Sequence, residues 1–314
     1  MSQLTYHNFD ISIEAIDAAP GGPGRYRVRV LNSPAGQAVD EFAIPFSPLE
    51  LENFFLRIGR PRRGVRSLHS SEGEAAQEFG RKLYDALFRG HVQAGLLRSL
   101  DAAERAGEGL RVRLRFNHAP ELVALPWEFL YDAANGRFLA HSTATPLVRY
   151  LELPRPLTPL PVQPPLQMLV MIANPRDHNA GQLDVEAEWA KVQAALAPLQ
   201  AQGLIAITRL ESATLAALQT QLRRNRYHIL HFIGHGGFDP ATHEGVLLLE
   251  DEQGRSRLVS GRLLGALLRD HPTLRLALLN ACEGARTGPS DPFAGVAQHL
   301  LQQGLPAVIA MQFE

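Results

Sequence analysis

The first half of the chain combines two patterns of apolar residues. Phe9–Ile16, Arg25–Val30 and Leu110–Phe116 alternate apolar with polar residues, which is typical of strands with one buried face. Glu41–Ile44 is predicted to add a further strand. Helical spacing is found within Leu49–Ile58 and Glu72–Leu100, where Phe79, Leu83 and Leu87 lie on one face. This half is predicted to be an α+β domain, with Trp127 anchoring its core; the alternative is that Trp127 and Glu128 mark a contact surface.

After residue 165, strands and helices alternate. Leu166–Ala173 is a continuous apolar run, as expected for a strand buried on both faces. Further strands are predicted at Leu204–Leu210, Tyr227–Ile233, Leu274–Leu279 and Ala307–Met311, and helices at Val185–Leu199, Thr214–Arg224, Ser260–Arg269 and Asp291–Leu301. A small hairpin is expected from Gly245–Glu250 with Leu258. The order predicts an α/β fold: a doubly wound, mostly parallel sheet with helices on both faces.

The two halves meet at a proline-rich segment. Leu153–Pro165 contains six prolines, which can continue neither a helix nor a central strand. The predicted organisation is therefore a smaller α+β domain at 1–152, a stiff linker at 153–165 and an α/β domain at 166–314.

The amino-acid composition limits which partners and which kinds of site the chain is expected to have. Lys and Arg total 31 against 32 Asp and Glu, so no overall positive field favours nucleic acid or an anionic membrane. No apolar run approaches the roughly 20 residues of a membrane-spanning helix, and the expectation is a cytoplasmic protein. The chain has one cysteine, Cys282, which excludes an internal disulfide and a cysteine-rich zinc site. His228 and His231 are interpreted as structural, so neither a metal nor a cofactor is expected.

Two predicted strand ends carry the candidate chemistry. The third strand of the second half runs into Gly234-His235-Gly236-Gly237, and the fourth into Asn280-Ala281-Cys282-Glu283-Gly284. Carboxyl ends of neighbouring parallel strands meet at one edge of a sheet, so His235 and Cys282 are expected side by side. An imidazole base activates a thiol, and the backbone N–H groups of Gly236 and Cys282 are candidates for an oxyanion hole. The alternative is that Cys282 is a buried, inert thiol.

The residues around these two strand ends resemble a known family. HFIGHGG around His235 and LLNACEGA around Cys282 are similar to the CHAT domain, a bacterial branch of the caspase-like cysteine proteases. LPWEFLYD, GRFLA, TPLVRYL and LPAVIAMQ resemble further CHAT segments in the same order. The resemblance implies a caspase-like fold, His235 as general base, Cys282 as nucleophile, and cleavage of a protein partner in a bacterial defence or signalling system.

The resemblance leaves the substrate open. In metacaspases, which cleave after basic residues, an aspartate lies two residues before the nucleophile, where this chain has Asn280. Glu283 and Asp177 are the other candidate substrate-binding residues, and Asp177 follows the first strand of the second half at the same sheet edge. For Asn174–Asp177 the alternative is an ordinary turn.

Two further expectations follow from the comparison with CHAT proteins. In that family more helix and strand follow the position of Met311–Glu314, so the α/β domain is expected to be truncated, processed or completed by another chain. The expected partners are a protein or peptide substrate and an activating partner or further domain. The alternative function is a non-catalytic module that binds a peptide between the strand ends.

Overall fold

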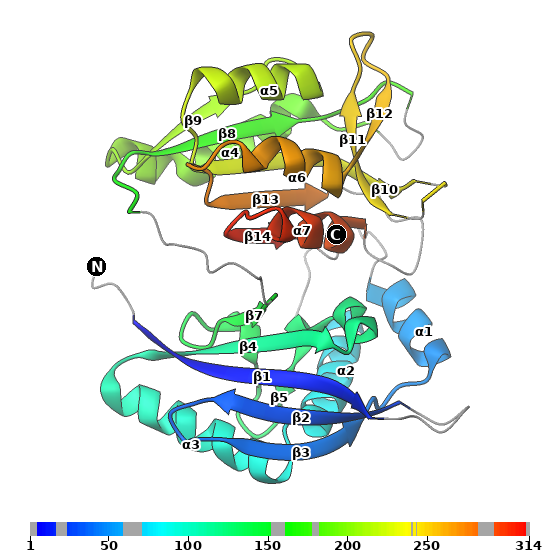
Figure 1. Cartoon of the computed structure of the whole chain (residues 1–314), viewed down its shortest axis with the longest axis vertical. Helices are drawn as coiled ribbons and strands as arrows, with labels where there is room; N and C mark the ends of the chain where they lie inside the picture. The colour runs from blue at the N-terminus through cyan, green and yellow to red at the C-terminus, as the bar shows by residue number, and fades with distance from the viewer. Residues whose placement is uncertain are drawn as a thin grey trace. The chain divides into compact units, whose positions relative to one another are not determined.

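The chain divides into two compact units in a computed structural model (Figure 1). Unit 1 spans Met1–Ile58 and Arg62–Glu152, and unit 2 contains Leu153–Glu314. The structure describes residues 5–16, 24–58, 71–151, 161–177, 182–239, 241–242, 244–281 and 292–311. Residues 153–160 of the predicted linker at 153–165 lie outside these ranges.

Unit 1 contains a five-stranded mixed sheet in the order β3-β2-β1-β4-β7. Its strands are β1 (Tyr6–Ile16), β2 (Arg25–Asn32), β3 (Ala38–Ala43), β4 (Gly109–His118) and β7 (Leu147–Arg149). The first three are antiparallel neighbours, whereas β4 runs parallel to both β1 and β7. Alternate residues of β2 and β4 are buried, which confirms two of the predicted half-buried strands. The prediction for Phe9–Ile16 is wrong in this respect: Phe9–Ile13 of β1 are buried on both faces, because polar residues such as Asp10 are covered by Arg113 and Arg115 of β4.

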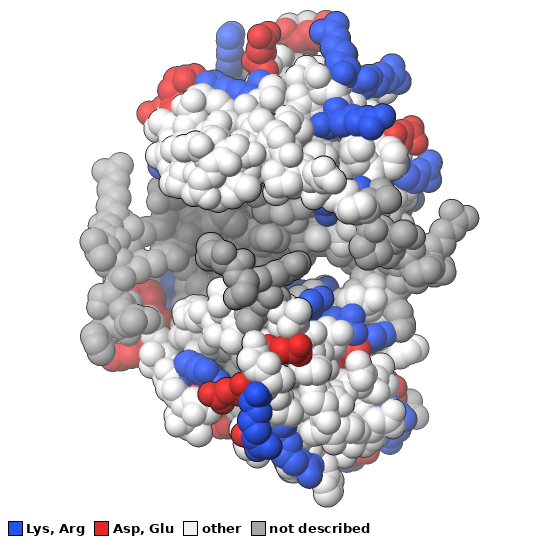
Figure 2. Space-filling view, turned by 90° about the vertical axis from the view of Figure 1, so that its left-hand side faces the viewer, with Lys and Arg blue, Asp and Glu red and all other residues white. Residues whose placement is uncertain are grey.

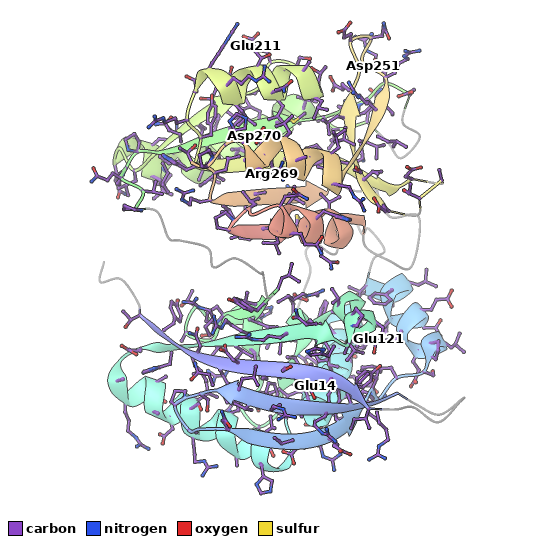
Figure 3. The ribbon with its side chains drawn as sticks, in the orientation of Figure 1. Glu14, Glu121, Glu211, Asp251, Arg269 and Asp270 are labelled. Carbon is purple, nitrogen blue, oxygen red and sulfur yellow. The ribbon has the colours of Figure 1, made fainter. Side chains whose placement is uncertain are left out.

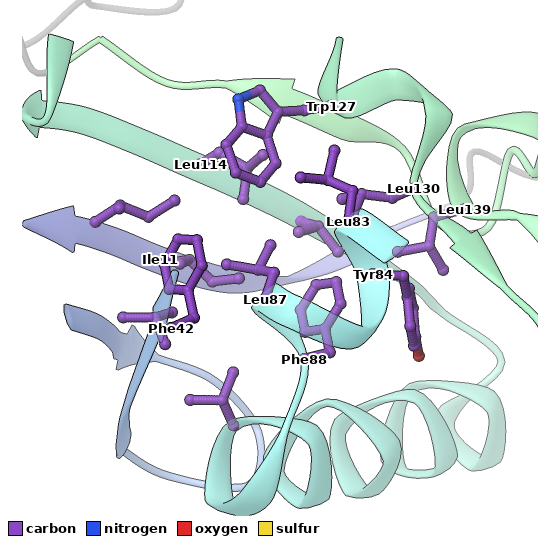
Figure 4. Packing of buried hydrophobic residues seen from close by; sticks show 14 of the residues in the cluster. Ile11, Phe42, Leu83, Tyr84, Leu87, Phe88, Leu114, Trp127, Leu130 and Leu139 are labelled. Carbon is purple, nitrogen blue, oxygen red and sulfur yellow. The ribbon is translucent and has the colours of Figure 1, made fainter. Parts of the chain in front are cut away.

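The apolar face of this sheet packs against helices α1 (Pro48–Ile58), α2 (Ser71–Leu87) and α3 (Gly90–Ala106). Figure 4 shows Leu83 and Leu87 of α2 lying over Ile11 and Leu114 of the sheet. Short 3-10 turns at Pro120–Ala124, Trp127–Phe129 and Leu139–His141 and a small hairpin, β5 (Tyr131–Asp132) and β6 (Arg137–Phe138), complete the unit. Trp127 is fully buried and its Nε1–H donates to the Leu122 carbonyl at 2.8 Å, so it anchors the core, as predicted.

The predicted helical segment Glu72–Leu100 is two helices rather than one. Arg89 is extended (φ −135°) and Gly90 has a φ of +49°, a value that favours glycine. The Asp40 carboxylate, on β3, accepts the N–H of Val92 at 2.7 Å and so satisfies a donor in the first turn of α3. Helical periodicity continues across the break, which explains why the sequence pattern did not reveal it.

Unit 2 contains a parallel sheet in the order β9-β8-β10-β13-β14. Its strands are β8 (Leu166–Ile172), β9 (Ile205–Arg209), β10 (Ile229–Phe238), β13 (Leu276–Ala281) and β14 (Ala307–Ala310). β11 (Gly245–Glu250) and β12 (Ser256–Ser260) extend β10 as antiparallel strands, which confirms the predicted hairpin.

Helices cover both faces of the parallel sheet. α4 (Val185–Ala201) contributes to the hydrophobic cluster on one face, while α5 (Leu215–Arg224), α6 (Gly261–Arg269) and α7 (Pro292–Gln302) contribute to the cluster on the other. Successive residues of β8 alternate between the two clusters: Leu169 and Met171 belong to the second cluster, and Met168 and Val170 to the first. β8 is therefore buried on both faces, as its continuous apolar sequence predicted.

Candidate active site

The candidate site lies at the edge of the parallel sheet of unit 2 where the pairing of β10 with β8 and β13 ends. β10 is flanked by β8 on one side and β13 on the other. Ile233 pairs with Ile172 of β8 and with Asn280 of β13, and Gly234 pairs with Ala281. The carboxyl ends of all three strands thus meet at one edge, where ligands bind in open α/β sheets.

β10 does not end where the sequence predicted. The expected strand stopped at Ile233, but β10 continues through Gly234-His235-Gly236-Gly237 to Phe238. Residues 229–234 pair in parallel with β13, and residues 235–238 pair antiparallel with β11, where His235 lies opposite Leu248. The glycine-rich segment is a strand and not a loop because β11 supplies it with a second backbone partner.

His235 is buried within this continuous strand, with 1% of its surface exposed. Gly234, the preceding residue, has no room for a side chain, because a Cβ would lie 3.2 Å from the Ala173 carbonyl oxygen and 2.7 Å from the Phe232 ring. Gly236, the predicted oxyanion donor, is also buried and lies opposite Leu247. The glycines therefore allow the end of β8 and the β11 strand to pack closely around the histidine.

The other predicted residues lie on the two flanking strands. Asn280 is half-buried near the end of β13, and Ala281 is the last residue of that strand. Cys282 and Glu283 follow directly in sequence and lie outside the described residues. The structure thus brings Asn280 beside the strand that carries His235, and it does not describe the predicted nucleophile.

Asp177 lies beyond β8 and faces the β11–β12 hairpin. Its Oδ1 accepts hydrogen bonds from the Ser256 N–H at 2.6 Å and the Ser256 hydroxyl at 2.7 Å. These two bonds lower the pKa of the Asp177 carboxyl below its usual range. The neighbouring Arg176 N–H donates to the Gly254 carbonyl at 2.9 Å. The turn after β8 is therefore fastened to the hairpin, whose tip carries Asp251 (Figure 3).

His228 and His231 have structural surroundings. The His228 Nδ1 accepts the Gln167 N–H at 2.9 Å. Burial and, to a lesser extent, nearby Arg275 lower the pKa of His228; burial also lowers that of His231, against a smaller opposite effect of Glu188. Within the described ranges, no group of three or more His, Cys, Asp or Glu side chains is arranged to hold a metal ion.

The lowered pKa of His231 gives stability a pH dependence. An unfolded chain takes up this proton more readily than the folded one, so the neutral histidine's contribution is complete above pH 6.5 and is lost as the pH falls below 6.5 toward the folded pKa. We expect His231→Leu to remove this loss, which is at most about 1.4 kcal/mol per pH unit. The free energy of unfolding is measured by urea titration at pH 7.5 and at pH 5.0, with His91→Gln, at an exposed position of α3, as the control. If wild type and His231→Leu lose the same free energy between the two pH values, His231 is not the source of the pH dependence.

Sequence reading did not single out Arg149 or Glu250. Arg149, on β7, pairs with Glu128 at 2.6 Å and donates to the carbonyls of Val123 and Leu125, so it holds the 3-10 turns in place. Glu250 ends β11 and contacts the turn after β8. Its only sequence signal is a charge at the end of the apolar run Gly245–Leu249.

Charge on the surface is mixed. On the side shown in Figure 2, Lys and Arg are interspersed with Asp and Glu in each unit. No helix in the described part of the chain combines the length and the apolar character needed to span a bilayer. Neither finding singles out a macromolecular partner.

Comparison with known proteins identifies the class. A mixed α/β unit with a parallel sheet and a buried histidine at the carboxyl edge is compatible with a caspase-like fold. The family model of the CHAT domain matches residues 77–314, and the chain belongs to the CHAT domain family, a group within the cysteine-protease-like superfamily. The match begins within α2, so it includes much of unit 1. A search of curated proteins found no match.

Proposed function

We propose that the chain is a cysteine endopeptidase that hydrolyses a specific protein partner through His235 and Cys282. The proposal rests chiefly on one observation: His235 is buried at the carboxyl edge of the sheet, and the residue before it pairs with the residue before Cys282. Membership of the CHAT family adds support. A role in a bacterial defence or signalling system belongs to the same proposal.

In the proposed reaction, His235 takes the proton of the Cys282 thiol, and the thiolate attacks a peptide carbonyl carbon. The N–H groups of Gly236 and Cys282 stabilise the oxyanion, and the protonated histidine gives its proton to the leaving amine. Water then hydrolyses the thioester and releases the free thiol. Asn280, Asp177 and Glu283 are proposed to contact the substrate.

The single cysteine makes a direct test possible, because any thiol label must be on Cys282. We expect wild-type protein to react with iodoacetamide well below pH 8.5, the usual thiol pKa, since a histidine stabilises the thiolate. His235→Ala should lower the rate at pH 6.5 by about tenfold or more. Intact mass across a pH series measures both rates.

Two controls decide the outcome. Cys282→Ala must abolish labelling. His271→Ala, on a histidine that precedes the amino end of β13 and so lies at the opposite edge of the sheet from the site, should leave the rate unchanged. If His235→Ala reacts with the wild-type profile, the dyad is wrong and a non-catalytic peptide-binding module becomes the better interpretation.

A further inference from the structure

The turn after β8 borders the strand that carries His235. We call residues Ala173–Asp177 the β8 loop. At its beginning, the Ala173 N–H donates to the Ile233 carbonyl at 2.8 Å, and the Ala173 carbonyl faces Gly234. The β8 loop therefore starts against β10 immediately before the histidine, on the side opposite to β13.

Glu250 holds the beginning of this loop. Its Oε1 accepts the N–H of Asn174 at 2.9 Å, across 76 residues of sequence. Glu250 ends β11 two residues after Leu248, the partner of His235. Its own N–H donates to the Ala213 carbonyl at 2.9 Å, so the backbone that carries the carboxylate is itself fixed. One side chain thus connects the strand opposite the histidine to the loop beside the histidine.

The rest of the β8 loop is fixed by other contacts. Arg176 and Asp177 bind Gly254 and Ser256 of the hairpin, as described above. The Asn174 side chain both donates to the Leu183 carbonyl at 3.0 Å and accepts the Leu183 N–H at 2.9 Å. The contacts of Arg176 and Asp177 lie farther along the loop, and the Asn174 side chain binds Leu183. Glu250 differs from these contacts because it joins the start of the loop to β11, the strand that pairs with His235. A carboxylate that accepts a backbone N–H makes a charge-assisted bond, which is stronger than a neutral one.

We propose that Glu250 is a positioning residue that holds the β8 loop as one wall of the substrate crevice beside His235. The proposal rests on the proposed peptidase function, because the wall matters only if a peptide occupies the carboxyl edge of the sheet. Glu250 acts through the Asn174 backbone and has no part in the proton transfer. Its loss should therefore weaken the binding of a peptide without changing the reactivity of the thiol.

The experiment compares a small and a large thiol reagent. Wild type, Glu250→Ala and Glu250→Gln are treated with iodoacetamide and with tripeptidyl chloromethyl ketones that carry Arg, Asp or Leu at P1. For Glu250→Ala we expect an iodoacetamide rate within about twofold of wild type and a half-saturating peptidyl concentration raised about tenfold. Glu250→Gln should restore most of the peptidyl affinity, because an amide oxygen also accepts an N–H.

Glu244→Gln is the matched control, since Glu244 precedes the same hairpin strand and pairs with exposed Arg262 at 3.3 Å. Hydrogen exchange of peptides spanning 173–184 should be faster in Glu250→Ala and near wild type in Glu250→Gln. The positioning role is wrong if Glu250→Ala has the same half-saturating peptidyl concentration as wild type. It is also wrong if Glu250→Ala reacts more slowly with iodoacetamide and with the peptidyl reagent by the same factor. His235→Ala labelling like wild type instead overturns the proposed function, and a wild type that no peptidyl reagent saturates overturns both.

Discussion

Gly80→Ala is expected to destabilise unit 1 by about 3 kcal/mol, because helix α2 leaves no space for a methyl group at this position. A Cβ there would lie 1.8 Å from the carbonyl oxygen of Phe129 and 3.0 Å from the Tyr131 Cβ. The nearest atom belongs to the backbone of the 3-10 turn at Trp127–Phe129, so relief requires the helix and the turn to separate. Chemical denaturation followed by circular dichroism measures the loss.

A second glycine provides the control. Gly95, in the middle of α3, is also buried, but a Cβ there would meet its nearest neighbours, the Ala38 Cβ and the Phe9 ring, at an ordinary 4.0 Å. Gly95→Ala should therefore be neutral or stabilise by up to about 1 kcal/mol through helix propensity. Similar stabilities of the two variants would show that α2 does not approach the turn this closely.

Asp10→Asn is expected to cost a similar amount, about 3 kcal/mol, because it breaks a buried ion-pair network. The Asp10 side chain, on β1, is 4% exposed and contacts the guanidinium groups of Arg113 and Arg115 on β4. Both guanidinium carbons lie 4.7 Å from the centre of the Tyr150 ring. Without the negative charge of Asp10, the two guanidinium groups next to each other have lost the anion that both of them contact.

Glu14, on the same strand, provides the control, because Glu14→Gln removes a carboxylate from an ion pair that is more exposed. Its contact with Arg29 is longer, at 3.7 Å, and the Glu14 and Arg29 side chains are 30% and 44% exposed. Glu14→Gln should change the free energy of unfolding by less than about 1 kcal/mol. Urea titrations of the two variants in 50 mM and 500 mM salt give the comparison, and a larger loss for Glu14→Gln than for Asp10→Asn would contradict it.

Local sequence patterns predicted most of the elements, because those patterns depend on which faces are buried. The apolar run at β8 is one example. The helices predicted to begin at Thr214 and Ser260 are another, and in the structure the hydroxyl groups of these two residues accept the N–H groups of Ala217 and Leu263. The break between α2 and α3 was missed because helical periodicity continues across it, and the carboxylate that satisfies the first turn of α3 belongs to Asp40, 52 residues before Val92. The parallel and antiparallel strand pairing in unit 1 likewise depends on contacts distant in sequence.

The candidate site was predictable to a similar degree. The predicted strand ends put His235 and Asn280 at one sheet edge, where both lie in the structure, whereas Cys282 and Glu283 lie outside the described residues. The extension of β10 could not be predicted, because a glycine-rich segment has no pattern of buried side chains to read. Glu250 was missed for a related reason: its contact with Asn174 joins segments 76 residues apart.

β10 pairs with three strands, with β8 and β13 before His235 and with β11 from His235 onward, so its alignment is fixed on both sides of the histidine. Six registered pairs with β13 precede His235, and four with β11 begin at it. A one-residue shift in a strand moves every side chain to the opposite face, so either misalignment would turn the histidine away from its side of the sheet. The parallel sheet and the hairpin would have to slip together for that to happen, which makes a wrongly oriented His235 a costly folding error.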